Sequence, residues 1–135
     1  MAKLIDELKK DHVAISTLLN RVKDPNVSNA EAHKILLSAQ ASLLAHLKKE
    51  DSQLYPVLNN AAKDNAGLKR TVDFYAKDMN EITRKAVEFF DKYSRHDSRI
   101  DLEFAKAFGN LFATISGRLR SEESTLYKEY EKLNP

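Results

Sequence analysis

A histidine and a glutamate with the spacing of metal ligands occur in residues 46–56, where His46 precedes Glu50 by four positions. Side chains at i and i+4 lie on the same face of a helix, so one metal ion could bind both. Residues 118–128 repeat the pattern, but Arg118 stands where the first copy has its histidine. Both copies keep the glutamate, an acidic residue after it, a serine and a Leu-Tyr pair. The sequence therefore contains one complete and one altered copy of a ligand motif.

Two further residues extend the complete copy to a set of four. His12 lies on the apolar stripe of the first predicted helix, and Glu122 is the glutamate of the altered copy. Two imidazoles and two carboxylates form a ligand set that suits iron or manganese, and also zinc. Burying two carboxylates without a cation costs several kcal/mol. The pattern therefore favours a metal site over an ordinary core, although Arg118 could supply a cation of its own.

Four helices are predicted to position these residues. The first spans about residues 2–23, and the second begins at the capping box formed by Ser28 and Glu31. The third carries a regular apolar stripe from Leu68 to Tyr93, and the fourth carries one from Phe104 to Leu126. Short connections between four such helices predict an all-α, up-down-up-down four-helix bundle.

The connections between the predicted helices are indicated by helix-breaking prolines and by runs of polar residues. Asp24-Pro25-Asn26 should end the first helix, and Pro56 should kink or end the second within a turn. Residues 59–67 are predicted to form a loop, and residues 94–99 a hydrophilic connection. Counting from these loops places His46, Met79 and Arg118 in one layer of the bundle.

Composition limits the remaining possibilities. With 135 residues, 42% hydrophobic content and only three glycines and three prolines, the chain reads as one helical domain over residues 1–135. Its 22 basic and 20 acidic residues are interspersed, which does not favour a nucleic-acid partner. The chain has no cysteine, so any metal must use nitrogen and oxygen ligands. The first residues turn charged before an apolar run develops, so we expect no membrane span and a cytoplasmic location.

The other candidate residues receive structural interpretations. His33 and His96 are expected on the surface, and Tyr55 and Tyr127 are expected to pack or form hydrogen bonds rather than to carry redox chemistry. The sequence has no glycine-rich phosphate loop, no Gly-x-Ser-x-Gly and no His-Glu-x-x-His. Since no histidine follows a glutamate by three positions, the ferritin-like di-iron pattern is excluded as well.

The whole chain resembles the hemerythrin-like, or HHE cation-binding, family. The similarity rests on Asp11-His12, on His46-x-x-x-Glu50 followed by Leu54-Tyr55-Pro56, and on the matching motif near the C-terminus. The resemblance implies a four-helix bundle that holds two non-haem irons, bridged by carboxylates of the second and fourth helices. It also implies oxygen binding, oxygen or redox sensing, or iron handling. Carried over by position, His12 and His46 correspond to ligands of one iron, with Glu50 and Glu122 as the bridging carboxylates.

Two positions depart from the family pattern, and both belong to the other iron. Met79 stands where the third helix usually presents a histidine, and Arg118 replaces the histidine of the fourth helix. We therefore expect one metal ion, iron, rather than a di-iron pair, in a monomeric binding or sensing module that is not an enzyme. Dioxygen or another diatomic molecule is the expected small partner.

Two alternatives remain for this altered site. In the first, the domain is a metal-free structural or interaction bundle in which Arg118 pairs with Glu50 and Glu122. In the second, Met79 and a histidine bind haem, but bulky phenylalanine and leucine side chains occupy the stripes where a porphyrin would need space.

Overall fold

The computed structural model describes residues 3–24, 26–93 and 101–133, and every regular element within these ranges is helical. Two π-helical segments continue directly from one α-helix into the next. The elements are α1 (Lys3–Val22), α2 (Asn29–Lys49), η1 (Glu50–Leu54), α3 (Tyr55–Ala62), α4 (Ala66–Tyr93), α5 (Leu102–Ser121), η2 (Glu122–Leu126) and α6 (Tyr127–Lys132). Because α2, η1 and α3 form one continuous rod and α5, η2 and α6 form another, the chain has four long helical arms.

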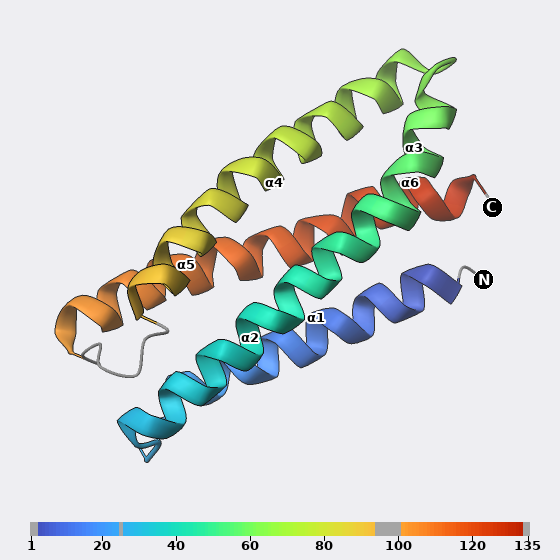
Figure 1. Cartoon of the computed structure of the whole chain (residues 1–135). Coiled ribbons are helices and arrows are strands. Elements are labelled where there is room, and N and C mark those ends of the chain that lie inside the picture. The colour runs from blue at the N-terminus through green and yellow to red at the C-terminus, as the bar shows by residue number, and fades with distance from the viewer. Residues whose placement is uncertain (1–2, 25, 94–100, 134–135) are drawn as a thin grey trace.

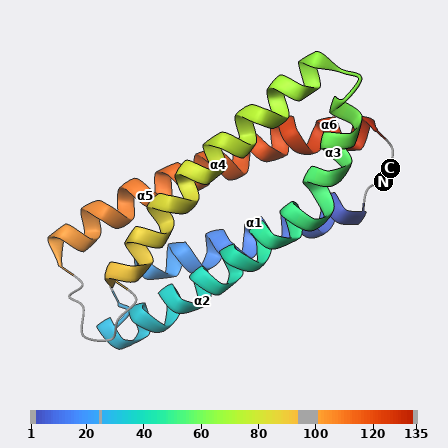
Figure 2. The same cartoon turned by 45° about the horizontal axis from the view of Figure 1, so that its top comes forward.

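The four arms alternate in direction (Figure 1). The start of α1, the α3–α4 junction and the end of α6 lie at one end of the molecule, while the ends of α1 and α4 and the starts of α2 and α5 lie at the other end (Figures 1 and 2). The predicted up-down-up-down four-helix bundle is therefore confirmed. The polar connection expected at residues 94–99, with His96, lies outside the described residues, as does Pro25 of the first predicted breaker.

Side-chain caps fix where two of the arms begin. The Ser28 hydroxyl accepts a hydrogen bond from the backbone N–H of Glu31 at 3.2 Å, which confirms the predicted cap of α2. The Asp101 carboxylate accepts one from the N–H of Phe104 at 3.0 Å and caps α5 in the same way. The cap of α2 was predicted from the sequence, whereas the cap of α5 is a further feature of the structure.

The sequence predicted that Pro56 would kink or end the second arm and that residues 59–67 would form a loop. The arm does not end there, and the predicted loop is wrong. Helix α3 continues to Ala62, and only three residues separate it from α4. Pro56 is tolerated because it lies in the first turn of α3, directly after the π-helical segment, where its missing N–H removes no α-helical bond. Beyond it, Leu58 and Ala62 are buried and hold the extension against the bundle.

Two apolar clusters sandwich a polar layer. One cluster lies near the chain termini and includes Leu8, Leu54 and Leu126. The other fills the opposite half and includes Ile15 and Leu43. His12 lies between Leu8 and Ile15 along α1, so the candidate ligands occupy the layer where the two cores meet. The apolar contacts on both sides hold the helices together independently of that layer.

Exposed large apolar side chains are spread over several arms and do not gather on one helix. They are Val13, Leu37, Leu44, Phe74, Val87, Leu102 and Leu133. None of the helices in the described ranges is long and apolar enough to cross a membrane. The monomeric state stays a prediction, which rests on the sequence argument that the four apolar stripes bury one another and leave no further long apolar face.

We expect the fold to survive removal of metal, because the two apolar clusters need no ion to form. Circular dichroism of protein treated with EDTA should show a highly helical spectrum and a cooperative thermal transition. Complete unfolding in EDTA would show instead that the ion holds the helices together.

Candidate metal centre

Both copies of the repeated motif form a π-helical segment, and each segment begins at its glutamate. η1 begins at Glu50 and η2 at Glu122, and in each the N–H of the following tyrosine bonds to the glutamate carbonyl five residues earlier. Such insertions change which later residues share a face with earlier ones, and they are common at functional sites. The repeated sequence motif thus has a repeated backbone geometry, a π-helical segment in each copy. The sequence pattern did not predict these segments.

The structure brings His12, His46, Glu50 and Glu122 together in the buried layer. One ligand atom from each lies within 4.8 Å of all the others. The His12 Nε2 atom lies 3.2 Å from His46 Nε2 and 3.1 Å from Glu122 Oε1, and His46 Nε2 lies 3.4 Å from Glu50 Oε2. Two donors that each bind one ion at about 2.1 Å lie about 3.0–3.4 Å apart. The four residues could therefore hold a single metal ion, with small side-chain shifts for separations near the 4.8 Å limit.

Acidic residues outside the cluster orient both imidazoles. Glu123 Oε2 lies 2.7 Å from His12 Nδ1, and Asp11 Oδ2 lies 3.1 Å from His46 Nδ1. Lys49 in turn donates to Asp11 at 3.0 Å. Carboxylates on the far ring nitrogen are the usual supports of histidine ligands, because they fix the ring and its tautomer. The spacing of the motifs predicts no role for Asp11 or Glu123, although each directly adjoins a candidate ligand in the chain.

The Tyr127 hydroxyl lies against all four candidate ligands. It donates to Glu50 Oε2 at 2.7 Å, and it lies 2.9 Å from His12 Nε2 and 3.2 Å from Glu122 Oε1. Burial raises the pKa of Tyr127, and the charges of Glu122 and Glu50 raise it further. The hydroxyl therefore keeps its proton in the metal-free protein. The predicted hydrogen-bonding role of this tyrosine is confirmed.

Arg118 is buried beside the cluster and binds three oxygen atoms. Its Nε donates to Glu122 Oε2 at 3.1 Å, Nη1 to Asp78 Oδ2 at 3.1 Å and Nη2 to the Tyr55 hydroxyl at 3.2 Å. The expected pairing with Glu122 is confirmed, but the expected direct pairing with Glu50 is wrong, since no such ion pair occurs among the described residues. Arg118 Nη2 donates instead to the hydroxyl of Tyr55, at the start of α3.

Met79 and Arg118 lie beside the same small cavity, which His46 and Glu122 also line. The cavity measures about 10 Å³, roughly the space of one water molecule. The predicted common layer of His46, Met79 and Arg118 is therefore confirmed, and side chains fill the space next to the candidate site.

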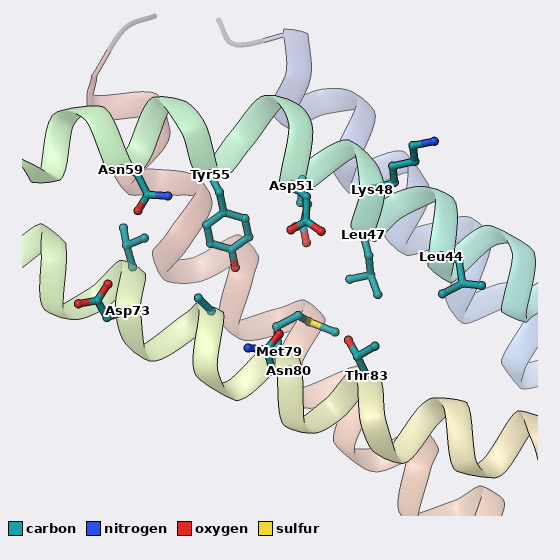
Figure 3. A pocket seen from close by; sticks show the side chains of 13 residues that line it. Leu44, Leu47, Lys48, Asp51, Tyr55, Asn59, Asp73, Met79, Asn80 and Thr83 are labelled. Carbon is teal, nitrogen blue, oxygen red and sulfur yellow. The ribbon is translucent and has the colours of Figure 1, made fainter.

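A larger groove of about 630 Å³ separates the second arm from α4. Glu50 belongs to its lining, and Figure 3 shows Asp51 and Tyr55 projecting from the second arm toward Met79 and Asn80 of α4. Glu50 Oε1 is buried and has no hydrogen-bond partner in the described part of the chain. A carboxylate oxygen in that state favours a cation or a donor as its natural partner.

The charged groups of the layer shift one another's pKa values. Burial alone would lower the pKa of His46, but contacts with Glu122, Glu50 and Asp11 overcome it and raise the pKa to about 10. Burial would raise the pKa of Glu122, yet hydrogen bonds from His12 and His46 and the charge of Arg118 hold it below its usual value. Burial and the charge of Glu122 raise the pKa of Glu50. Without a metal, protonated His46 and Arg118 thus balance the carboxylates.

His33 does not join the cluster, and its predicted surface position is wrong. It is buried on α2 next to Ala32 and close to Ile35. Because Ala32 and His33 are consecutive and both buried, the buried face of α2 is wide near its start. The single apolar stripe seen in the sequence does not predict so wide a buried face.

Comparison with known proteins agrees with this geometry. The family model described as the hemerythrin HHE cation binding domain matches residues 3–130, which is nearly the whole chain. No curated protein and no solved structure matches the chain. This chain belongs to the hemerythrin HHE cation-binding domain family.

Proposed function

We propose that this domain binds one iron ion through His12, His46, Glu50 and Glu122, and acts as a binding or sensing module rather than as an enzyme. The observation that carries the proposal is the convergence of four buried ligand atoms within 4.8 Å of one another. The unpartnered Glu50 Oε1 atom adds support, because a cation nearby would compensate its burial. Mixed imidazole and carboxylate ligands suit iron, as they also suit manganese and zinc, and the family resemblance favours iron among these.

The proposal of one ion rests on what surrounds the site. The Arg118 guanidinium, bound to Glu122, already provides the positive charge on one side of the carboxylates. Met79 offers only a thioether, which is a poor ligand for a hard iron ion. A module of this kind would not carry dioxygen as a di-iron pair does. The groove lined by Glu50 offers dioxygen or another diatomic molecule a route toward the site.

Metal content tests the proposal directly. Protein reconstituted with Fe(II) and freed of excess metal should contain no more than one iron per chain by elemental analysis. His46→Ala should abolish binding because it removes a central ligand, whereas Met79→Leu should leave the iron content unchanged. Two tightly held irons per chain would contradict the assignment of Arg118 and Met79 as vacant ligand positions.

A metal-free interaction bundle is the second candidate, favoured by the buried Arg118–Glu122 ion pair at 3.1 Å. Protein that remains without metal after reconstitution with iron, manganese and zinc in turn would support this candidate over the first. An ultraviolet-visible spectrum recorded on the same samples distinguishes iron-loaded from metal-free protein.

A further inference from the structure

The Tyr127 hydroxyl is placed as a metal ligand would be. Its oxygen lies between 2.7 and 3.5 Å from a donor atom of each of His12, His46, Glu50 and Glu122. An ordinary buried tyrosine needs one partner for its hydroxyl. A hydroxyl shared among four candidate ligands therefore requires a separate explanation.

The separations of Tyr127 Oη from the other four donors, 2.7–3.5 Å, are similar to the 3.1 Å between His12 Nε2 and Glu122 Oε1 and the 3.4 Å between His46 Nε2 and Glu50 Oε2. His46 Nε2 and Glu122 Oε1 lie farther apart, at 3.9 Å, as two donors on opposite sides of one ion would. Donors bound at about 2.1 Å at right angles lie about 3.0 Å apart. Oη thus lies at the distance from the other donors that a fifth donor would have.

The η2 insertion is what turns Tyr127 toward the cluster. In an α-helix, residues five apart point about 140° away from each other, at about 100° per residue. In η2 the bonds span five residues, and Tyr127 Oη lies 3.2 Å from Glu122 Oε1. Tyr127 has 0% exposure and stacks on the His12 ring with a centroid distance of 5.4 Å. Its position is therefore fixed by both backbone and packing.

The equivalent tyrosine of the other motif copy has a different partner. Tyr55 follows Glu50 as Tyr127 follows Glu122, and it also comes directly after a π-helical segment. Its hydroxyl accepts a hydrogen bond from Arg118 at 3.2 Å, on the side of the altered motif. The chain thus provides a matched pair of tyrosines, one at the candidate metal position and one at the arginine.

We propose that Tyr127 is a fifth ligand of the iron and binds through Oη as a phenolate. The inference rests on the proposed function, since it needs an ion at the four-residue site. In the metal-free protein the Tyr127 hydroxyl donates a hydrogen bond to Glu50. When the ion binds, Oη loses this proton to solvent and bonds to the ion instead. Two carboxylates and one phenolate carry three negative charges, and the Arg118 guanidinium paired with Glu122 offsets one of them, so the site can hold either a ferrous or a ferric ion.

The competing interpretation is that Tyr127 keeps its proton and only donates a hydrogen bond to Glu50 when iron is bound. The two interpretations differ in the spectrum of the ferric protein. A phenolate bound to Fe(III) gives a visible charge-transfer band, and excitation in that band enhances the tyrosinate ring vibrations in the resonance Raman spectrum. A protonated tyrosine gives neither signal.

The test uses the full chain loaded with Fe(II) and oxidised in air, with iron content measured on each sample. We expect the wild-type ferric protein to show the visible band and tyrosinate vibrations. Tyr127→Phe should lose both completely while still binding iron, and Tyr55→Phe should keep both. Circular dichroism of each variant checks its fold.

Three results would overturn the inference. Ferric wild-type protein without tyrosinate vibrations would do so by itself, even if Tyr127→Phe failed to fold. Retention of the signals in Tyr127→Phe would do so too, because another tyrosine would then be the ligand. If the wild-type protein binds no iron at all, the proposed function fails together with this inference, whereas iron bound without tyrosinate signals defeats the inference alone.

Discussion

Replacing Arg118 with alanine is expected to lower the free energy of unfolding of the metal-free protein by about 3–5 kcal/mol. The Arg118 side chain is 3% exposed and donates to Glu122, Asp78 and Tyr55. Its removal leaves the carboxylate of Glu122, itself 1% exposed, without its arginine partner in a buried layer. Urea unfolding of EDTA-treated wild-type and variant proteins, followed by circular dichroism, measures the difference.

Arg84 supplies the matched control for this measurement. It also pairs with two carboxylates, those of Glu81 and Glu88, but its side chain is 56% exposed. Solvent screens an exposed pair, so Arg84→Ala should change stability much less than Arg118→Ala. Equally small changes in both variants would show that Arg118 is not the counter-cation of the layer.

Added metal should restore the stability that Arg118→Ala loses. An ion that binds only the folded state stabilises it by about 2.7 kcal/mol at one hundred times its dissociation constant. Titration of the variant with Fe(II) under anaerobic conditions should therefore raise its urea midpoint. The wild-type protein should gain too, but from a higher starting stability. If added metal did not reduce the stability loss of Arg118→Ala, the ion could not replace the charge of Arg118.

The members of the metal layer could be predicted from the sequence, but their full environment could not. The i, i+4 spacing of His46 and Glu50, together with the repeat at Glu122, identified residues that the structure places within a few ångströms. The hydroxyl of Tyr127 was missed because α-helical periodicity points it away from Glu122. Only the π-helical register brings the two together.

The fold could be predicted where apolar periodicity determines it. The prediction failed where tertiary contacts override local signals in the sequence. The stripes of the four arms predicted the bundle, since each arm buries one face. Pro56 signalled a helix end, yet Leu58 and Ala62 find buried positions beyond it and the helix continues. His33 showed the same limit, because its burial depends on how neighbouring arms cover α2 and not on its own position in the stripe.

The stability of the metal-free protein should fall as pH rises from about 6.5 to about 10. In the folded state, carboxylates raise the pKa of His46 to about 10, whereas an unperturbed histidine titrates near 6.5. The stabilisation is fully present below the unfolded pKa and is lost as pH rises through the folded one. The shift corresponds to at most roughly 5 kcal/mol. Urea unfolding in EDTA at pH 6, 8 and 9.5 gives the slope.

Two comparisons make this pH dependence specific to His46. His46→Gln removes the titrating group, so its stability should change little between pH 6.5 and 9.5, apart from effects shared with the wild type. Bound metal should reverse the sign, because an ion binds the neutral imidazole and competes with the proton for its ring nitrogen. Metal affinity should therefore increase with pH over the range in which metal-free stability decreases. Equal slopes in wild type and His46→Gln would show that His46 holds no extra proton in the folded protein, and that the buried carboxylates are balanced by Arg118 and neighbouring donors instead.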